Sequence, residues 1–269
     1  MIELTTLSHS PASILGLGGN QSMDINCIQT AFNAGVNYFF FYNLSCESFL
    51  QGLKPLLKEA REEILVATGS EHRDHNELKQ YLERVRHRLN IDVIDLFFLE
   101  YVSPADDLAQ IQAILDELHY WKEQGLIRYV GVTVHNRSIA IKLIESGACE
   151  LLMHRYNMAH RKAEQSVLPA AQTDGIPVIA FTCTRWGSLL EGHPNWSGQI
   201  PTAADCYRYA LTNNAVRMAL TSPKTVVQLE ENLQVLNNPK LNQAEQSLWQ
   251  SYGDLVYGDG QDSFETQWL

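Results

Sequence analysis

The hydrophobic and polar positions of this chain alternate regularly between Ile14 and Asn232, where short apolar runs and amphipathic segments follow one another eight times. Apolar runs bounded by Gly, Pro, Asn and Asp are typical of buried parallel strands. We therefore predict strands at residues 14–18, 38–42, 64–68, 94–100, 129–134, 151–156, 178–182 and 216–221. Eight strands that each lead into a helix predict an α/β fold, a (β/α)8 TIM barrel.

The amphipathic segments predict the helices that surround such a barrel. Residues 77–89 place leucine and valine at helical spacing along one stripe, with lysine and arginine on the other faces. Residues 108–125 show the same spacing and end at Gly125, a residue type that suits a helix C-terminus. Asp24 precedes the first helix, and we expect its side chain to cap it.

Three segments fall outside the eightfold repeat. Residues 2–13 predict a small N-terminal hairpin that closes the bottom of the barrel. Residues 191–202 are rich in Gly, Pro, Asn and Ser and predict a long surface loop, and residues 243–256 predict one extra C-terminal helix. No change of composition divides the chain, so we expect residues 1–269 to form a single domain.

Composition restricts the classes of partner. No apolar run approaches the ~20 residues that span a bilayer, and the N-terminus does not resemble a secretory signal, so we expect a cytoplasmic protein without membrane contact. The net charge of −11 argues against nucleic acid. The five cysteines form no C-x-x-C pair and the histidines no metal-ligand spacing, so neither disulfides nor a metal site is expected.

Motifs at the predicted strand ends resemble those of the aldo-keto reductases over nearly the whole chain. The matching segments are LGLGG at 15–19, GVNYF at 35–39, VIDLFFL at 93–99, QGLIRYVGV at 124–132, YNMAHR at 156–161, GIPVIAFT at 175–182 and LEEN at 229–232. Each alone is weak, but their order coincides with the eightfold repeat. The resemblance implies hydride transfer from NADPH to a carbonyl, aided by an Asp, Tyr, Lys and His set on strands two to four.

The chain departs from the family at each of these four catalytic positions. Where the family has Asp-Thr-Ala and then Tyr, this chain has Phe-Phe-Tyr at residues 40–42 and then Ser45. The lysine position is Gly69 and the histidine position is Glu100. The resemblance therefore implies a divergent branch with a degenerate catalytic tetrad.

The resemblance also implies the residues of an NADP(H) site. The family's Ser, Asn and Gln ligands of the nicotinamide amide correspond to Thr133, Val134 and Met153, of which only Thr133 keeps a hydrogen-bonding group. Arg185 is expected at the pyrophosphate, and Lys224, near a helix N-terminus, at the adenosine 2'-phosphate. The complete expected site is Thr133, Phe181, Thr182, Thr184, Arg185, Ser222, Lys224, Thr225, Gln228, Glu231 and Asn232.

Tyr42 and Glu100 are the candidate catalytic residues. A carbonyl that accepts a hydride develops negative charge on its oxygen, which a proton donor must neutralise. Glu100 ends a very apolar strand, where a desolvated carboxyl group keeps its proton, and the phenol of Tyr42 is a second possible donor. Packing at the barrel rim is the alternative for Tyr42.

His135, Arg155 and Trp186 are the candidate residues of a substrate pocket, since each lies just beyond a predicted strand or in a loop at the same mouth. A solvated cap is the alternative for His135, a structural ion pair for Arg155, and packing beneath the long loop for Trp186.

The favoured hypothesis is an oxidoreductase that binds NADP(H) and acts on an unknown small carbonyl or alcohol with an acid that the family does not use. The alternative is a redox-inactive barrel that binds a ligand or serves as a scaffold or regulator, which the loss of amide ligands at Val134 and Met153 favours. A lyase or isomerase with Glu100 as base is a third hypothesis. Substrate and oligomeric state stay open, as does whether redox chemistry survives.

Overall fold

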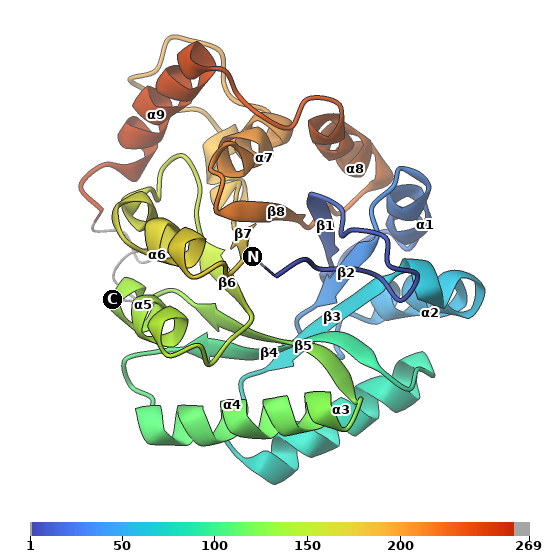
Figure 1. The fold of residues 1–269 in the computed structure, drawn as a ribbon. Helices are drawn as coiled ribbons and strands as arrows, with labels where there is room; N and C mark the ends of the chain where they lie inside the picture. Colours follow the sequence, from blue (N-terminus) through green and yellow to red (C-terminus); the bar gives the residue numbers. More distant parts are fainter. Residues whose placement is uncertain (1, 261–269) are drawn as a thin grey trace.

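Eight parallel strands close into a barrel in sequence order, which confirms the predicted fold class (Figure 1). The structure is a computed structural model that describes residues 2–260. Its strands are β1 (Leu15–Gly18), β2 (Tyr38–Phe41), β3 (Leu65–Ser70), β4 (Ile94–Val102), β5 (Ile127–Val134), β6 (Leu151–Arg155), β7 (Val178–Phe181) and β8 (Val216–Thr221). Each strand begins and ends within two residues of the position predicted from the apolar runs.

Helices surround the barrel on all sides, and the expected C-terminal helix packs at its periphery (Figure 1). They are α1 (Asn26–Asn33), α2 (Glu47–Ala60), α3 (His75–Leu89), α4 (Leu108–Glu123), α5 (Arg137–Glu145), α6 (Val167–Thr173), α7 (Ala203–Thr212), α8 (Val226–Leu233) and α9 (Gln243–Tyr257). The prediction that Asp24 caps α1 is wrong by one position. The N-cap residue is Ile25, and Asp24 Oδ1 accepts a hydrogen bond from the backbone N of Asn26 at 2.9 Å.

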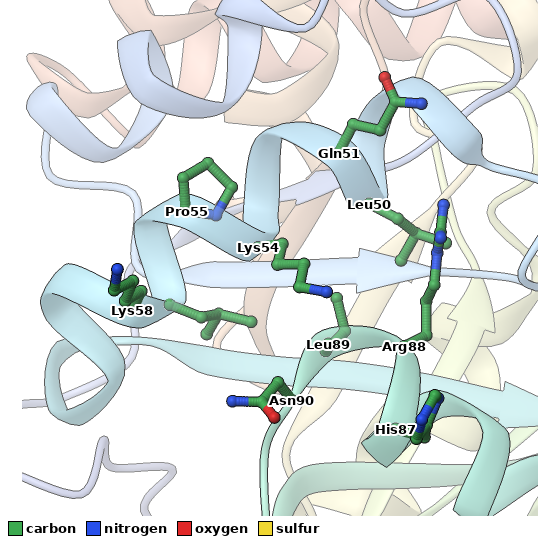
Figure 2. A pocket seen from close by; sticks show the side chains of 10 residues that line it. Leu50, Gln51, Lys54, Pro55, Lys58, His87, Arg88, Leu89 and Asn90 are labelled. Atoms are coloured by element: carbon green, nitrogen blue, oxygen red, sulfur yellow. The ribbon is translucent and has the colours of Figure 1, made fainter.

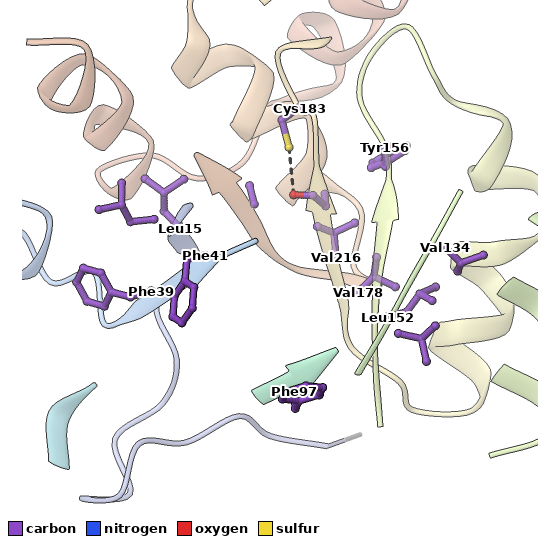
Figure 3. Packing of buried hydrophobic residues seen from close by; sticks show 14 of the residues in the cluster. Leu15, Phe39, Phe41, Phe97, Val134, Leu152, Tyr156, Val178, Cys183 and Val216 are labelled. Atoms are coloured by element: carbon purple, nitrogen blue, oxygen red, sulfur yellow. Dashed lines mark hydrogen bonds between the residues drawn. The ribbon is translucent and has the colours of Figure 1, made fainter. Parts of the chain in front are cut away.

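Alternation along the strands divides the buried side chains into two clusters. Phe39, Phe41 and Phe97 belong to the cluster that packs between strands and helices, part of which Figure 3 shows. Phe40 and Phe98, one residue away from members of that cluster, belong instead to a cluster that fills the barrel lumen. The lumen is therefore a packed core, and space for a ligand can open only at its ends.

The predicted N-terminal hairpin is present in a reduced form. Thr5 and Pro11 form a single antiparallel bridge, and Ala12 N donates to Leu4 O at 2.8 Å. Leu4 is buried against the lumen cluster, so this leader closes the end of the barrel at which the strands begin. Residues 191–202 contain no helix or strand, as predicted.

A buried carboxylate joins β3, β4 and β5 near their first residues. Asp95 is fully buried, and it forms ion pairs with Arg61 at 2.9 Å and Arg128 at 2.7 Å. Its Oδ2 also accepts from Val66 N at 2.9 Å, and Arg128 donates to Thr6 O in the leader at 3.2 Å. The two guanidinium groups and the backbone N–H provide partners for a carboxylate whose burial alone would be costly.

Candidate active site

Side chains from four strand ends meet at the opposite end of the barrel, where the strands terminate. Their rings form a continuous row from Tyr42, after β2, to Phe181, in β7. Tyr42 lies edge-on to Tyr101 at 5.6 Å between ring centroids, Tyr101 stacks on His135 at 5.4 Å, and His135 contacts Phe181 at 5.1 Å. The barrel mouth therefore brings together Tyr42, His135 and Phe181, which the sequence placed at separate strand ends.

Glu100 is the most unusual group at this mouth. Its side chain is 1% exposed, and Oε1 has no hydrogen-bond partner among the described residues. Burial raises the pKa of the Glu100 carboxyl group well above its usual 4.5, and the charge of Glu71 raises it further. A carboxyl group in this environment holds its proton at pH values where an exposed glutamate is ionised.

Gly69 of β3 provides the space that the Glu100 side chain occupies. A Cβ atom at position 69 would lie 2.5 Å from Glu100 Oε1 and 2.6 Å from Phe98 O, both too short for real contacts. Tyr38 of β2 also faces the lumen, its buried hydroxyl lacks a partner among the described residues, and burial and then Glu100 raise its pKa. Two buried oxygens in the lumen thus lack hydrogen bonds among the described residues, which is typical of places that a ligand or water completes.

Tyr101 is a residue of the mouth that the sequence did not indicate. The register between β4 and β5 shifts between Leu99 and Val102, and Tyr101 has a φ of 52°, in the left-handed region. Strict alternation after Glu100 would have turned Tyr101 outward, but a bulge re-aims the side chain. Its ring consequently reaches the stack with His135.

The wall formed by β5 and β6 carries histidine and arginine. His135, Arg155 and His154 line one small cavity with residues of the following loops. Burial, and then Arg155, lower the pKa of His135 to about 3, so its imidazole is neutral. His154 makes a 2.7 Å hydrogen bond to Val134 O through Nδ1, and burial lowers its pKa to about 4. This wall therefore presents neutral imidazoles beside a cationic guanidinium.

Two hydroxyl groups lie where the resemblance predicts the nicotinamide. Thr133 Oγ1 and Thr182 Oγ1 are buried without a hydrogen-bond partner in the described part of the chain. Phe181, which contacts His135 at the same mouth, is only partly buried. Orphaned hydroxyls beside an accessible aromatic face fit a planar ring that carries an amide. Val134 does not face this space, because its side chain packs in the outer cluster, whereas Met153 fills the lumen.

The loop after β7 is tied to the C-terminal helix. Arg185 is nearly buried and its Nη1 donates to Val256 O of α9 at 2.7 Å. Thr182, Arg185 and Trp186 all have positive φ, and the Thr184 carbonyl accepts from Gly187 N at 3.0 Å. Trp186 is 70% exposed. The Arg185 guanidinium thus donates one hydrogen bond to α9, and its role at a pyrophosphate stays a prediction.

The loop after β8 is shaped by local hydrogen bonds. Thr225 caps α8 by accepting from Gln228 N at 3.2 Å, and Gln228 Oε1 accepts from Lys224 N at 2.9 Å. Asn20, which the sequence did not single out, donates to Ser222 Oγ at 3.0 Å from the loop after β1. The Lys224 side chain is exposed at this helix N-terminus, in a position that suits a phosphate.

Two of the expected adenine-side residues point in different directions. Asn232 is buried, and its Nδ2 donates to Thr221 Oγ1 of β8 at 2.9 Å. Glu231 is exposed on α8. The structure therefore places Asn232 in the packing between α8 and the barrel, and it brings Ser222, Lys224, Thr225 and Gln228 together in one loop.

The described chain also contains a groove that lies away from the strand ends. It has a volume of about 620 Å³ and separates α2 from the end of α3, with Leu50, Lys54 and Pro55 on one side and Arg88 and Leu89 on the other (Figure 2). Because it lies among outer helices, it is not the candidate active site.

Neither a metal centre nor a membrane segment emerges from the part of the chain that the structure describes. Residues 2–260 contain no group of three or more His, Cys, Asp or Glu side chains arranged to hold a metal ion. None of the helices α1–α9 is long and apolar enough to cross a membrane.

Comparisons with known proteins agree with this geometry. The sequence profile of the aldo/keto reductase family matches residues 17–254. The uncharacterized oxidoreductase YqkF of Bacillus subtilis (strain 168) is 22% identical over 281 residues, covering 88% of this chain and 90% of the relative. The methylglyoxal reductase DkgA of Escherichia coli O157:H7 is 29% identical over 178 residues, covering 59% of this chain and 63% of the relative. The holo form of aldo-keto reductase AKR11C1 from Bacillus halodurans superimposes with a TM-score of 0.77 at 20% identity, over 97% of this chain and all of that one.

Proposed function

Because this chain belongs to the aldo/keto reductase family, we propose that it is an oxidoreductase that interconverts a small carbonyl compound and its alcohol with NADP(H) bound at the barrel mouth. The observation that carries the proposal is the Glu100 carboxyl group, which is buried, has no partner on Oε1 among the described residues, and has a pKa that burial raises well above its usual value. It lies in the lumen at the end of β4, where barrels of this class place their chemistry. The names of the relatives, an oxidoreductase and a methylglyoxal reductase, support this reaction type.

The residues present fit the cofactor at two places. The orphaned hydroxyls of Thr133 and Thr182, with the ring of Phe181, would hold the nicotinamide. Lys224 and Thr225, at the N-terminus of α8, would hold the adenosine 2'-phosphate. When bound, NADPH supplies a hydride to the carbonyl carbon of a substrate.

The proposed task of this chain's own residues is to deliver the proton. The oxygen of a carbonyl gains negative charge during reduction, and a neutral carboxyl group is a competent donor to it. Gly69 leaves room for the Glu100 side chain, and burial raises the pKa of its carboxyl group, which favours the protonated form. Tyr42, at the rim of the same mouth, offers a phenol as a second donor. The raised pKa of Glu100 works against the hypothesis that it is the base of a lyase or isomerase.

One observation favours the redox-inactive alternative. Met153, at a position where the resemblance predicts an amide ligand, is buried in the lumen and offers no hydrogen-bonding side chain, and the side chain of Val134, at a second such position, packs in the outer cluster instead. A nicotinamide amide that loses its partners in a desolvated site binds less well. In that alternative, the mouth binds a ligand without transferring hydride.

Titration with NADPH and a turnover assay separate the two functions. We expect saturable binding, followed by nicotinamide fluorescence, and consumption of NADPH with methylglyoxal or another small aldehyde. Lys224→Ala should weaken the binding of NADPH more than that of NADH, because only NADPH carries the 2'-phosphate. The control Lys79→Ala, at an exposed position, should weaken the binding of neither cofactor. Binding of NADPH without turnover across an aldehyde and quinone panel supports the ligand-binding alternative, and absence of NADPH binding contradicts the proposed oxidoreductase.

A further inference from the structure

A second cavity lies at the opposite end of the barrel, where the strands begin. It has a volume of about 470 Å³, within the range of pockets that hold small molecules. Its walls are the N-terminal leader, the first residues of β7 and β8, and the connection from α8 to α9. Figure 1 shows the leader crossing this end of the barrel beside β8. This cavity is therefore separate from the candidate active site.

The inner part of this cavity is apolar. Ile179 of β7 and Met218 of β8 form its deep surface, and both belong to the cluster that fills the lumen. Leu4 and Ala12 of the leader face the same space and pack against that cluster. A hydrocarbon chain or ring would find aliphatic contacts from both the leader and the strands.

The rim of the cavity is cationic because of a bulge in β8. Val178 pairs with Val216 and the next residue, Ile179, pairs with Met218, so Arg217 is an extra residue in its strand. A bulge of this kind re-aims a side chain, and Arg217 lines the cavity and is exposed at its rim. Lys240 adds a second cation, with its Nζ 2.9 Å from Asn214 Oδ1. Glu3 is the single carboxylate among the described lining residues.

We propose that this cavity is a binding site for an amphipathic monoanion, a molecule with an apolar chain or ring that ends in a carboxylate. The apolar part lies against Ile179 and Met218 under the leader, and the carboxylate lies between Arg217 and Lys240. On a chain whose net charge is −11, two cations beside one carboxylate form a local site of opposite sign. The proposal does not depend on the function of Glu100, because the two sites lie at opposite ends of the strands.

Binding at this site would also hold the leader in place. Within the described chain, Ile2 N donates to Gly175 O at 3.1 Å, and one bridge joins Thr5 to Pro11. Thr5 N also donates to the Tyr129 hydroxyl, and Arg128 to Thr6 O. A ligand that contacts both the leader and β8 adds to these bonds. The melting temperature should therefore rise with ligand concentration, as expected for any ligand that binds only the folded state.

Calorimetric titration of the full chain with decanoate, below its micelle concentration, tests the proposal, and decan-1-ol is the uncharged control. We expect saturable decanoate binding. The double variant Arg217→Ala/Lys240→Ala should weaken decanoate binding about fivefold and leave decan-1-ol binding unchanged. The expected factor is modest because both cations lie near the solvent. Because both side chains are exposed, this variant is expected to fold.

Filling the cavity provides an independent test. Ala12→Trp should abolish decanoate binding, because the indole occupies the apolar part, whereas Leu7→Trp, at an exposed leader position that does not line the cavity, should preserve it. Decanoate binding that does not saturate overturns the proposal. If the double variant loses as much affinity for decan-1-ol as for decanoate, the proposal is also overturned. A folded Ala12→Trp variant that binds decanoate as tightly as the wild-type chain overturns it as well. NADPH binding at the mouth should be unchanged in each variant, so a failure here is distinguishable from a failure of the proposed function.

Discussion

Replacing Gly69 with alanine tests the packing that places the Glu100 carboxyl group. The added Cβ would lie 2.5 Å from Glu100 Oε1, 2.6 Å from its Cγ and 2.6 Å from Phe98 O. Overpacking a core costs about 1–3 kcal/mol. Phe98 O belongs to the backbone of β4, so most of the movement falls on the Glu100 side chain. We expect Gly69→Ala to lower the free energy of unfolding by about 2 kcal/mol.

A double-mutant cycle with Glu100→Ala measures how much of this cost comes from Glu100. The truncation removes two of the three short contacts and leaves only Phe98 O. Gly69→Ala should therefore cost about 1 kcal/mol less in the Glu100→Ala background than in the wild-type chain. Urea unfolding monitored by tryptophan fluorescence gives each free energy. Equal costs in the two backgrounds would refute the reasoning, since Glu100 would then not occupy the space beside Gly69.

The same variant has a consequence for the proposed chemistry. A Glu100 side chain displaced from beside Gly69 moves toward water, and its pKa falls toward the usual range because desolvation is the main cause of the raised value. The pH at which kcat declines, as the acid loses its proton, should move down in Gly69→Ala. An unchanged pH profile together with the loss of stability would assign Gly69 a packing role alone.

Three further predictions concern buried ionisable groups. Glu100→Gln removes the proposed donor and should lower kcat by about 10²–10⁴-fold in steady-state kinetics, whereas the exposed-acid control Glu63→Gln should change it little; equal losses would contradict the assignment. Burial lowers the pKa of His154 from 6.5 to about 4, so its contribution to stability is complete above 6.5 and is lost as the pH falls toward 4. His154→Gln should flatten that part of a curve of unfolding free energy against pH, and an unaltered curve would assign the acid sensitivity elsewhere. Asp95→Ala leaves two guanidinium groups, each about 20% exposed, without their shared carboxylate. It should lower the free energy of unfolding, measured in urea, by about 3 kcal/mol. A smaller loss than that of an exposed ion pair would show that both guanidinium groups are fully hydrated.

The barrel was predictable because the pattern of neighbouring residues along the chain indicates each strand. Each buried strand is a short apolar run, most of them bounded by Gly, Pro, Asn or Asp, and the closed order β1 to β8 agrees with the short connections between them. The position of Glu100 was predictable for the same reason, since it ends one of those runs. The sequence also predicted that burial at the end of an apolar strand would favour the protonated form of this group, and the raised pKa of Glu100 has the same direction and cause.

Several contacts of the candidate site were not predictable, because they depend on irregular backbone or on segments far apart in the chain. Tyr101 reaches the mouth only because of the bulge in β4, and the residue type at that position does not predict a bulge. Arg185 bonds to Val256, 71 residues later, and Asn20 to Ser222, 202 residues later. Alternation and motif spacing describe neighbours along one strand, and they contain no information about which distant loop closes over a strand end.

Positions 69 and 100, where the resemblance predicts lysine and histidine, are best understood as one packing unit. With a long side chain at position 69, the space taken by the Glu100 carboxyl group would be filled, as the 2.5 Å approach of a single Cβ already indicates. An ammonium group there would also favour the ionised form of a neighbouring carboxyl group, whereas glycine leaves desolvation as the main influence on its pKa. Restoring lysine alone, by Gly69→Lys, should therefore not rebuild the usual family site. It should displace or ionise Glu100 and abolish any turnover that depends on its proton, and a Gly69→Lys variant with undiminished activity would exclude Glu100 as the donor.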